Sequence, residues 1–138
     1  FRAPCCGRTR TRLGSTRALQ VVVALLALVP VAAGGAGVLL GPVAFAPDAD
    51  LTVDLDSHVR YLSGIFLALG IAFWTTVPGI ARKTGRFRLL AALVVAGGLA
   101  RLLSLLLAGT PSAGHLAGLG LELVVVPLLV LWQSRIAR

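Results

Sequence analysis

The feature that most constrains this chain is a run of 30 residues without a charged side chain, from Ala18 to Pro47. About 20 apolar residues are enough for a helix to cross a bilayer. A secretory signal peptide also follows basic residues, but its apolar region is only about 7–15 residues long. We therefore predict an uncleaved membrane-spanning helix over residues 18–41. We expect the basic leader before it, residues 1–17, to be disordered.

Composition supports a membrane protein. Hydrophobic residues make up 57% of the chain and charged residues only 13%, whereas soluble domains are about one quarter charged. The net charge of +8 would suggest nucleic-acid binding in a soluble protein. Here the basic residues stand at the ends of apolar segments, so we predict membrane lipids as partners and no nucleic acid. The sequence says nothing about the oligomeric state.

Three further apolar segments are predicted to span the membrane as helices, at residues 56–78, 87–108 and 114–133. A single span over residues 102–121 is the alternative for the last two. It would place the turn-forming segment 109–114, Gly-Thr-Pro-Ser-Ala-Gly, inside the lipid, where unpaired backbone groups are costly. The sequence therefore predicts an all-α, four-helix transmembrane bundle over residues 18–133.

Charge asymmetry predicts the orientation. The leader, the loop between the second and third spans, and the C-terminal tail at residues 134–138 hold eleven basic residues and no acid. The loop between the first two spans holds four aspartates: Asp48, Asp50, Asp54 and Asp56. Basic loops stay on the cytoplasmic side. We predict a multi-pass protein of the cell (inner) membrane with both termini cytoplasmic.

Three ionisable side chains fall inside or at the rim of the predicted spans: Arg60, Arg101 and Glu122. Such residues are expensive in lipid and are usually paired. At 1.5 Å per residue, Arg101 and Glu122 lie at similar depths on neighbouring antiparallel helices, roughly 10 and 12 Å from the outer end. This predicts an Arg101–Glu122 ion pair. Arg60 lies roughly 5–8 Å deep.

These charges define a predicted ligand-binding site in the outer half of the bundle. Small residues stand at four-residue steps beside each charge, so each charge is expected on a packing face. Two arginines facing one glutamate would leave a positive charge for an anionic headgroup. Two alternatives stay open: the Arg101–Glu122 pair only orients its helices, or Arg60 reaches the headgroups, Asp54 or Asp56. The predicted site residues are Arg60, Arg101, Glu122, His58, Gly64 and Ser104.

No residue pattern indicates a catalytic site, a cofactor or a metal. Cys5 and Cys6 are adjacent and lack CxxC spacing, while His58 and His115 stand alone on different segments. The chain has no phosphate-binding loop, no HExxH motif, no G-x-S-x-G motif and no dinucleotide fingerprint. We predict no cofactor and no metal. The absence of a nucleophile and base pair argues against an enzyme.

Three segments, considered together, resemble one known family. Arg60-Tyr61-Leu62-Ser63-Gly64 opens the second span, Gly98-Leu99-Ala100-Arg101-Leu102 lies in the third, and Glu122-Leu123-Val124 lies in the fourth. The combination resembles the bacterial four-helix membrane family catalogued as domain of unknown function 4345, over roughly residues 18–133. The resemblance implies a four-helix membrane fold and points to Arg60, Gly64, Arg101 and Glu122. It implies no activity.

Three hypotheses for the function remain open. The first is a membrane module that binds a small anionic or amphiphilic ligand, such as a lipid headgroup or a quinone. The second is a structural or interaction subunit of a membrane complex, in which the charges only lock helix packing. The third is a small membrane enzyme or redox partner.

Overall fold

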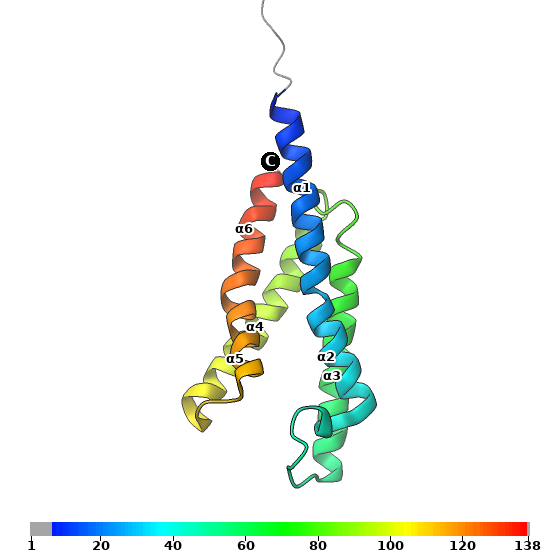
Figure 1. The fold of residues 1–138 in the computed structure, drawn as a ribbon, viewed down its shortest axis with the longest axis vertical. Coiled ribbons are helices and arrows are strands. Elements are labelled where there is room, and N and C mark those ends of the chain that lie inside the picture. Colours follow the sequence, from blue (N-terminus) through cyan, green and yellow to red (C-terminus); the bar gives the residue numbers. More distant parts are fainter. Residues whose placement is uncertain (1–6, 138) are drawn as a thin grey trace, which may run out of the picture. The chain divides into compact units, whose positions relative to one another are not determined.

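The computed structural model describes residues 7–137, and this part of the chain is all helical, with no strand (Figure 1). The segments form four successive helical stretches, so the all-α prediction is confirmed. They are α1 Gly7–Leu26, α2 Leu28–Leu40, the short 3-10 turn η1 Gly41–Ala44, α3 Val53–Trp74, α4 Thr84–Ala108, α5 Ala113–Gly120, the π-helical turn η2 Leu121–Val125 and α6 Val126–Ile136.

Three of the four stretches are long and apolar enough to cross a membrane: Leu13–Ala44, Thr84–Ala108 and Ala113–Ile136. Large apolar side chains are exposed along them, with Leu107 79% and Leu39 78% exposed. Exposing that apolar surface to water is unfavourable, whereas exposing it to lipid tails carries no such cost. The protein is therefore a membrane protein by the nature of its exposed surface.

Helix α3, Val53–Trp74, both begins and ends earlier than its predicted span at residues 56–78. It ends at Trp74, because Pro78 has no backbone N–H and its ring would crowd the carbonyl of residue 74 in a continuing helix. The charged residues of α3 lie in its first two turns, which leaves Tyr61–Trp74 as its uncharged part. These 14 residues extend roughly 21 Å.

The first helical stretch also departs from the prediction. Helix α1 begins at Gly7, upstream of the predicted start at residue 18, while residues 1–6 lie outside the described residues. Contacts hold this end of α1 in place: Leu19 is fully buried, and Ser15 accepts a hydrogen bond from Trp132. The stretch is interrupted at Ala27 because Pro30 cannot donate to the carbonyl four residues earlier.

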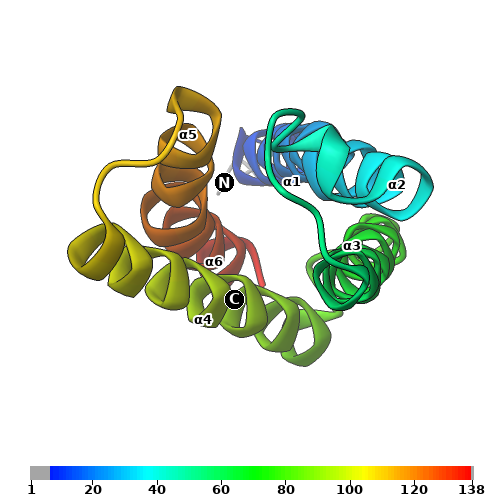
Figure 2. The ribbon, with the colours of Figure 1, turned by 90° about the horizontal axis from the view of Figure 1, so that it is seen from below.

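The chain divides into two compact units, residues 1–19 with 79–138 and residues 20–78. We call the first the α4–α6 unit, since α4, α5, η2 and α6 pack together in it with the start of α1. We call the second the α2–α3 unit. Figure 2 shows α2 running alongside α3, and α4 crossing the helical stretch that ends in α6.

Glycines bring α2 and α3 into backbone contact. A Cβ at Gly34 would lie 2.5 Å from the backbone nitrogen of Leu67, and one at Gly37 would overlap the hydroxyl of Ser63. On α3, a Cβ at Gly70 would lie 2.7 Å from a methyl group of Val31. Helices in lipid associate mainly through such close packing, because lipid tails are as apolar as the side chains.

The α4–α6 unit has its own close approach. A Cβ at Gly98 of α4 would lie 2.8 Å from Cβ of Glu122 and 2.8 Å from Cδ2 of Leu123. At the other end of α4, Phe87 is 1% exposed and Leu90 is 8% exposed. The contact at Gly98 places Glu122 against α4, and this contact positions the polar site described below.

Substituting neighbouring glycines of α2 tests the packing. Gly34→Ala should lower the stability of the purified protein by about 1–3 kcal/mol, because the added methyl group meets backbone that cannot rotate away. Gly35→Ala is the matched control, since a Cβ there meets nothing within 4 Å. The measurement is thermal unfolding in detergent. Equal stability of the two variants would contradict the close backbone contact.

Candidate functional site

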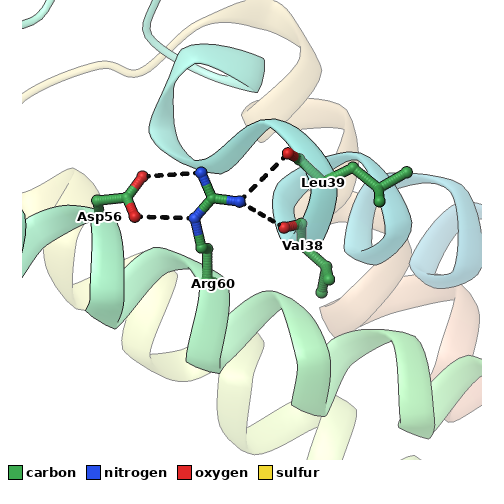
Figure 3. A network of polar contacts seen from close by, with 4 residues as sticks. All are labelled: Val38, Leu39, Asp56 and Arg60. Atoms are coloured by element: carbon green, nitrogen blue, oxygen red, sulfur yellow. Dashed lines mark hydrogen bonds and ion pairs between the residues drawn. The ribbon is translucent and has the colours of Figure 1, made fainter.

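Arg60 forms a paired contact with the first turn of its own helix. Thr52 caps α3 through its hydroxyl, which accepts from the backbone N–H of Leu55 at 3.2 Å, and Asp54 and Asp56 lie in the first turn, where carboxylates favour the helix dipole. Asp56 and Arg60 are one turn apart. Arg60 Nε donates to Asp56 Oδ2 at 2.8 Å, and Nη2 donates to Oδ1 at 3.1 Å (Figure 3).

The third nitrogen of Arg60 reaches the C-terminal end of α2. Nη1 donates to the backbone carbonyls of Val38 at 2.7 Å and Leu39 at 3.2 Å (Figure 3). The last carbonyls of a helix lack intrahelical partners and carry its negative dipole end, so a guanidinium there is doubly favourable. We call these four residues, Val38, Leu39, Asp56 and Arg60, the Arg60 clamp.

Gly41 makes room for the Arg60 clamp. It follows α2 with φ +66°, and a Cβ there would lie 2.5 Å from Asp56 Oδ1 and 3.0 Å from Arg60 Nη2. Positive φ is easily adopted only by glycine. One residue therefore both ends α2 and leaves space for the guanidinium of α3.

The Arg60 clamp balances the charge of Arg60. Four of the five N–H groups of the guanidinium donate within the clamp. The surplus positive charge that motivated an anionic ligand is therefore answered by Asp56, and the alternative pairing of Arg60 with this aspartate is the observed one.

The predicted Arg101–Glu122 ion pair is confirmed. Arg101 Nε donates to Glu122 Oε2 at 3.1 Å, and Nη2 donates to Oε1 at 3.2 Å. The arginine side chain is 32% exposed and the glutamate side chain 11% exposed. Two parallel hydrogen bonds fix the orientation of the guanidinium relative to the carboxylate more firmly than a single hydrogen bond would.

The π-helical turn η2 carries Glu122. Pro127 follows it, and a proline in an ordinary α-helix would crowd the carbonyl of Leu123, four residues earlier. The backbone widens instead, so that the N–H of Val126 donates to the carbonyl of Leu121, five residues back. Such turns often occur at functional sites. The close contact at Gly98 then holds the stem of Glu122 against α4.

Arg101 keeps hydrogen-bonding capacity beyond the ion pair. Only two of its five N–H groups donate to Glu122. Its Nη1 lies beside Gly118, where a Cβ would be 3.9 Å from that nitrogen. Within residues 7–137 we find no further hydrogen bond from this guanidinium, which lies in the apolar helix α4.

The remaining predicted site residues lie apart from these bonds. Gly64 is half-buried on α3, where a Cβ would be 3.9 Å from Cγ2 of Val38. His58 and Ser104 are exposed. The structure thus brings Arg101 and Glu122 together in the α4–α6 unit, while Arg60 and Gly64 face α2 in the α2–α3 unit. Their role in ligand binding stays a prediction.

Two further predicted features are refined. His115 bonds through Nδ1 with the hydroxyl of Ser112 at 2.8 Å, at the start of α5. The small residues beside the ion pair are Gly98, next to Glu122, and Gly118, next to Arg101. Within residues 7–137, no three or more His, Cys, Asp or Glu residues gather to hold a metal ion.

Sequence reasoning missed two residues of the site. Pro127 lies inside the apolar segment five residues after Glu122 and signals the wide turn. Gly41 directly follows the apolar part of α2 and signals an end to that helix. Both signals are visible in the sequence, but the contact of Arg60 with Val38 and Leu39 needs the pairing of α2 with α3.

Comparison with known proteins bears on this arrangement. The sequence model of a family described as Domain of unknown function (DUF4345) matches residues 18–133. The chain belongs to this family. The matched DUF4345 region contains both arginine–carboxylate pairs and every predicted site residue. No curated protein and no solved structure matches the chain.

A double-mutant cycle tests the ion pair of the DUF4345 domain. Arg101→Met or Glu122→Met alone leaves the other side chain as an unpaired charge and should lower the free energy of unfolding by on the order of 3 kcal/mol. The double variant should recover much of that loss, because no charge is left unpaired. The measurement is unfolding in detergent. Additive losses would show that the two side chains do not interact.

Proposed function

We propose that this protein is a multi-pass membrane module that binds the polar headgroup of an amphiphilic molecule at the Arg101–Glu122 pair. The observation that carries the proposal is the unused capacity of Arg101. Its guanidinium donates twice to Glu122, is 32% exposed and lies within an apolar helix. An N–H group without an acceptor is costly in hydrocarbon.

The ligand chemistry follows from the charge of the pair. Glu122 neutralises Arg101, so the site needs hydrogen-bond acceptors rather than a full negative charge. Phosphate, carboxylate or quinone carbonyl oxygens at the end of an apolar body would suit it. Glu122, held by η2 and the contact at Gly98, would keep the guanidinium oriented toward such a headgroup.

The proposed topology places this site in the outer half of the membrane. The basic residues before α1, between α3 and α4, and after α6 favour the cytoplasmic side of the cell (inner) membrane. Both termini then lie on that side, which requires α3 to cross with the three longer stretches. The uncharged chain continues from Trp74 to Ala81 beyond the end of α3, which lengthens the apolar part of this crossing.

A structural role is the second candidate, and the close contacts favour it. The Arg60 clamp ties α3 to the end of α2, and Glu122 approaches α4 so closely at Gly98 that an added Cβ there would lie 2.8 Å from Cβ of Glu122. On this view the charges lock each pair of helices for assembly with other membrane proteins, and no ligand is bound.

Substitution of Arg101 by lysine separates these candidates. Arg101→Lys keeps the charge opposite Glu122 but loses the planar set of donors. We expect a short-chain quinone or phosphatidylglycerol to raise the unfolding temperature of the native protein by several degrees, and of Arg101→Lys much less. Arg60→Lys, in the α2–α3 unit, is the control and should respond as the native protein does. Equal responses of Arg101→Lys and the native protein would favour the structural role.

Reporter fusions test the topology. Fusions after Gly85 and Arg138 should show cytoplasmic activity, and a fusion at Asp50 should show external activity, because the basic segments stay inside. The measurement is a paired assay with a reporter active only inside and one active only outside. An external signal at Gly85 would rule out the orientation.

A further inference from the structure

The C-terminal end of α6 is tied to two other segments of the α4–α6 unit. Trp132 Nε1 donates to the hydroxyl of Ser15 on α1 at 3.0 Å. Gln133 Nε2 donates to the carbonyl of Ile80 at 3.0 Å and to the hydroxyl of Thr84 at 2.8 Å. Gln133 is fully buried, so these side chains fix the start of α4, the turn before it and the end of α6 beside α1.

Four of the tied residues, Ser15, Ile80, Thr84 and Gln133, are each followed two positions later by an exposed arginine. In the helices α1, α4 and α6, two residues turn the chain by about 200°, so the arginines there face away from the buried contact. Arg82 also lies over Gly79, where a Cβ would be 3.6 Å from its Nη2. We call this set the arginine collar: Arg17, Arg82, Arg86 and Arg135.

The charge of the arginine collar is not balanced by nearby acids. In residues 7–19 and 79–137, the described part of this unit, Glu122 is the only acidic residue. It is already paired with Arg101 and lies 11 residues before Gln133, roughly 16 Å along the helix. Anions that pair with the arginine collar would therefore come from outside the described part of this unit.

The surroundings of the arginine collar identify those anions as lipid. It lies where three apolar membrane-spanning stretches begin or end. Leu89 and Leu131, 62% and 57% exposed, stand beside it along α4 and α6. A guanidinium binds phosphate through two parallel bonds, and basic groups between helix ends recruit anionic headgroups. A soluble acidic partner would leave these leucines uncovered.

We propose that the arginine collar is a binding site for anionic phospholipid, with preference for a headgroup that carries two phosphates. The four arginines each lie two residues from a group that hydrogen bonds join to Trp132 or Gln133, or from Gln133 itself, so they belong to the same end of the unit. Two linked phosphates can neutralise more of them than one phosphate can. This site is distinct from the one at Arg101, which lies 17 residues from Thr84, roughly 26 Å along α4.

The test uses the full chain in phosphatidylcholine nanodiscs containing either cardiolipin, which has two phosphates, or phosphatidylglycerol at equal total charge. Retained lipid is counted by native mass spectrometry, and affinity is measured by lipid titration. The native protein should retain cardiolipin preferentially. The variant with Gln at all four positions of the arginine collar should bind it at least about tenfold more weakly. If that variant does not fold, the four single Arg→Gln variants should each weaken binding.

A charge-matched variant controls for general attraction. Replacing Arg2, Arg8, Arg10 and Arg12 by Gln removes the same charge from the N-terminal segment and should leave the cardiolipin preference in place. Equal losses in the collar and N-terminal variants would overturn the site. So would tighter binding of an acidic peptide than of cardiolipin, because the partner would then be a protein.

Discussion

The cost of placing charge beside lipid is the constraint on which this structure depends. A guanidinium in an apolar helix must find a carboxylate and enough acceptors nearby. Arg60 finds Asp56 one turn away and two carbonyls of α2, whereas Arg101 finds Glu122 on the next helical stretch. Each arginine is thus paired with a carboxylate inside its own compact unit, and the Arg60 clamp and the Arg101–Glu122 pair each join two helical segments.

Glycine makes both pairings feasible. Gly41 leaves room for the guanidinium of Arg60, and Gly98 lets the stem of Glu122 approach α4. The two arginines differ in how many N–H groups of the guanidinium are left without an acceptor. Arg60 uses four of its five N–H groups within the Arg60 clamp, while Arg101 uses two. The clamp therefore acts as a structural element, and the remaining donors of Arg101 make it the better candidate for binding.

The helices and the Arg101–Glu122 pair could be predicted from the sequence, because a charged side chain in lipid needs an oppositely charged partner at a similar depth. The similar depth of Arg101 and Glu122 in their predicted spans was enough to predict that they pair. The apolar segments of the sequence were enough to predict the positions of the helices. Sequence reasoning left the partner of Arg60 open among the lipid headgroups, Asp54 and Asp56, and the structure shows that the partner is Asp56, four residues earlier on the same helical face. The extent of α1 depends on tertiary contacts of Ser15 and Leu19, which no local pattern in the basic leader reveals.

Solid-state NMR of the protein in lipid tests the central claim, that each arginine is paired within its own unit. With ¹⁵N in the arginine side chains and ¹³C in the side-chain carboxyl groups, dipolar recoupling detects which guanidinium contacts which carboxylate. Glu122→Gln and Asp56→Asn variants assign the signals. We expect a contact of Arg101 with Glu122 and of Arg60 with Asp56. A contact between Arg60 and Glu122, or the absence of any contact for Arg101, would contradict that claim.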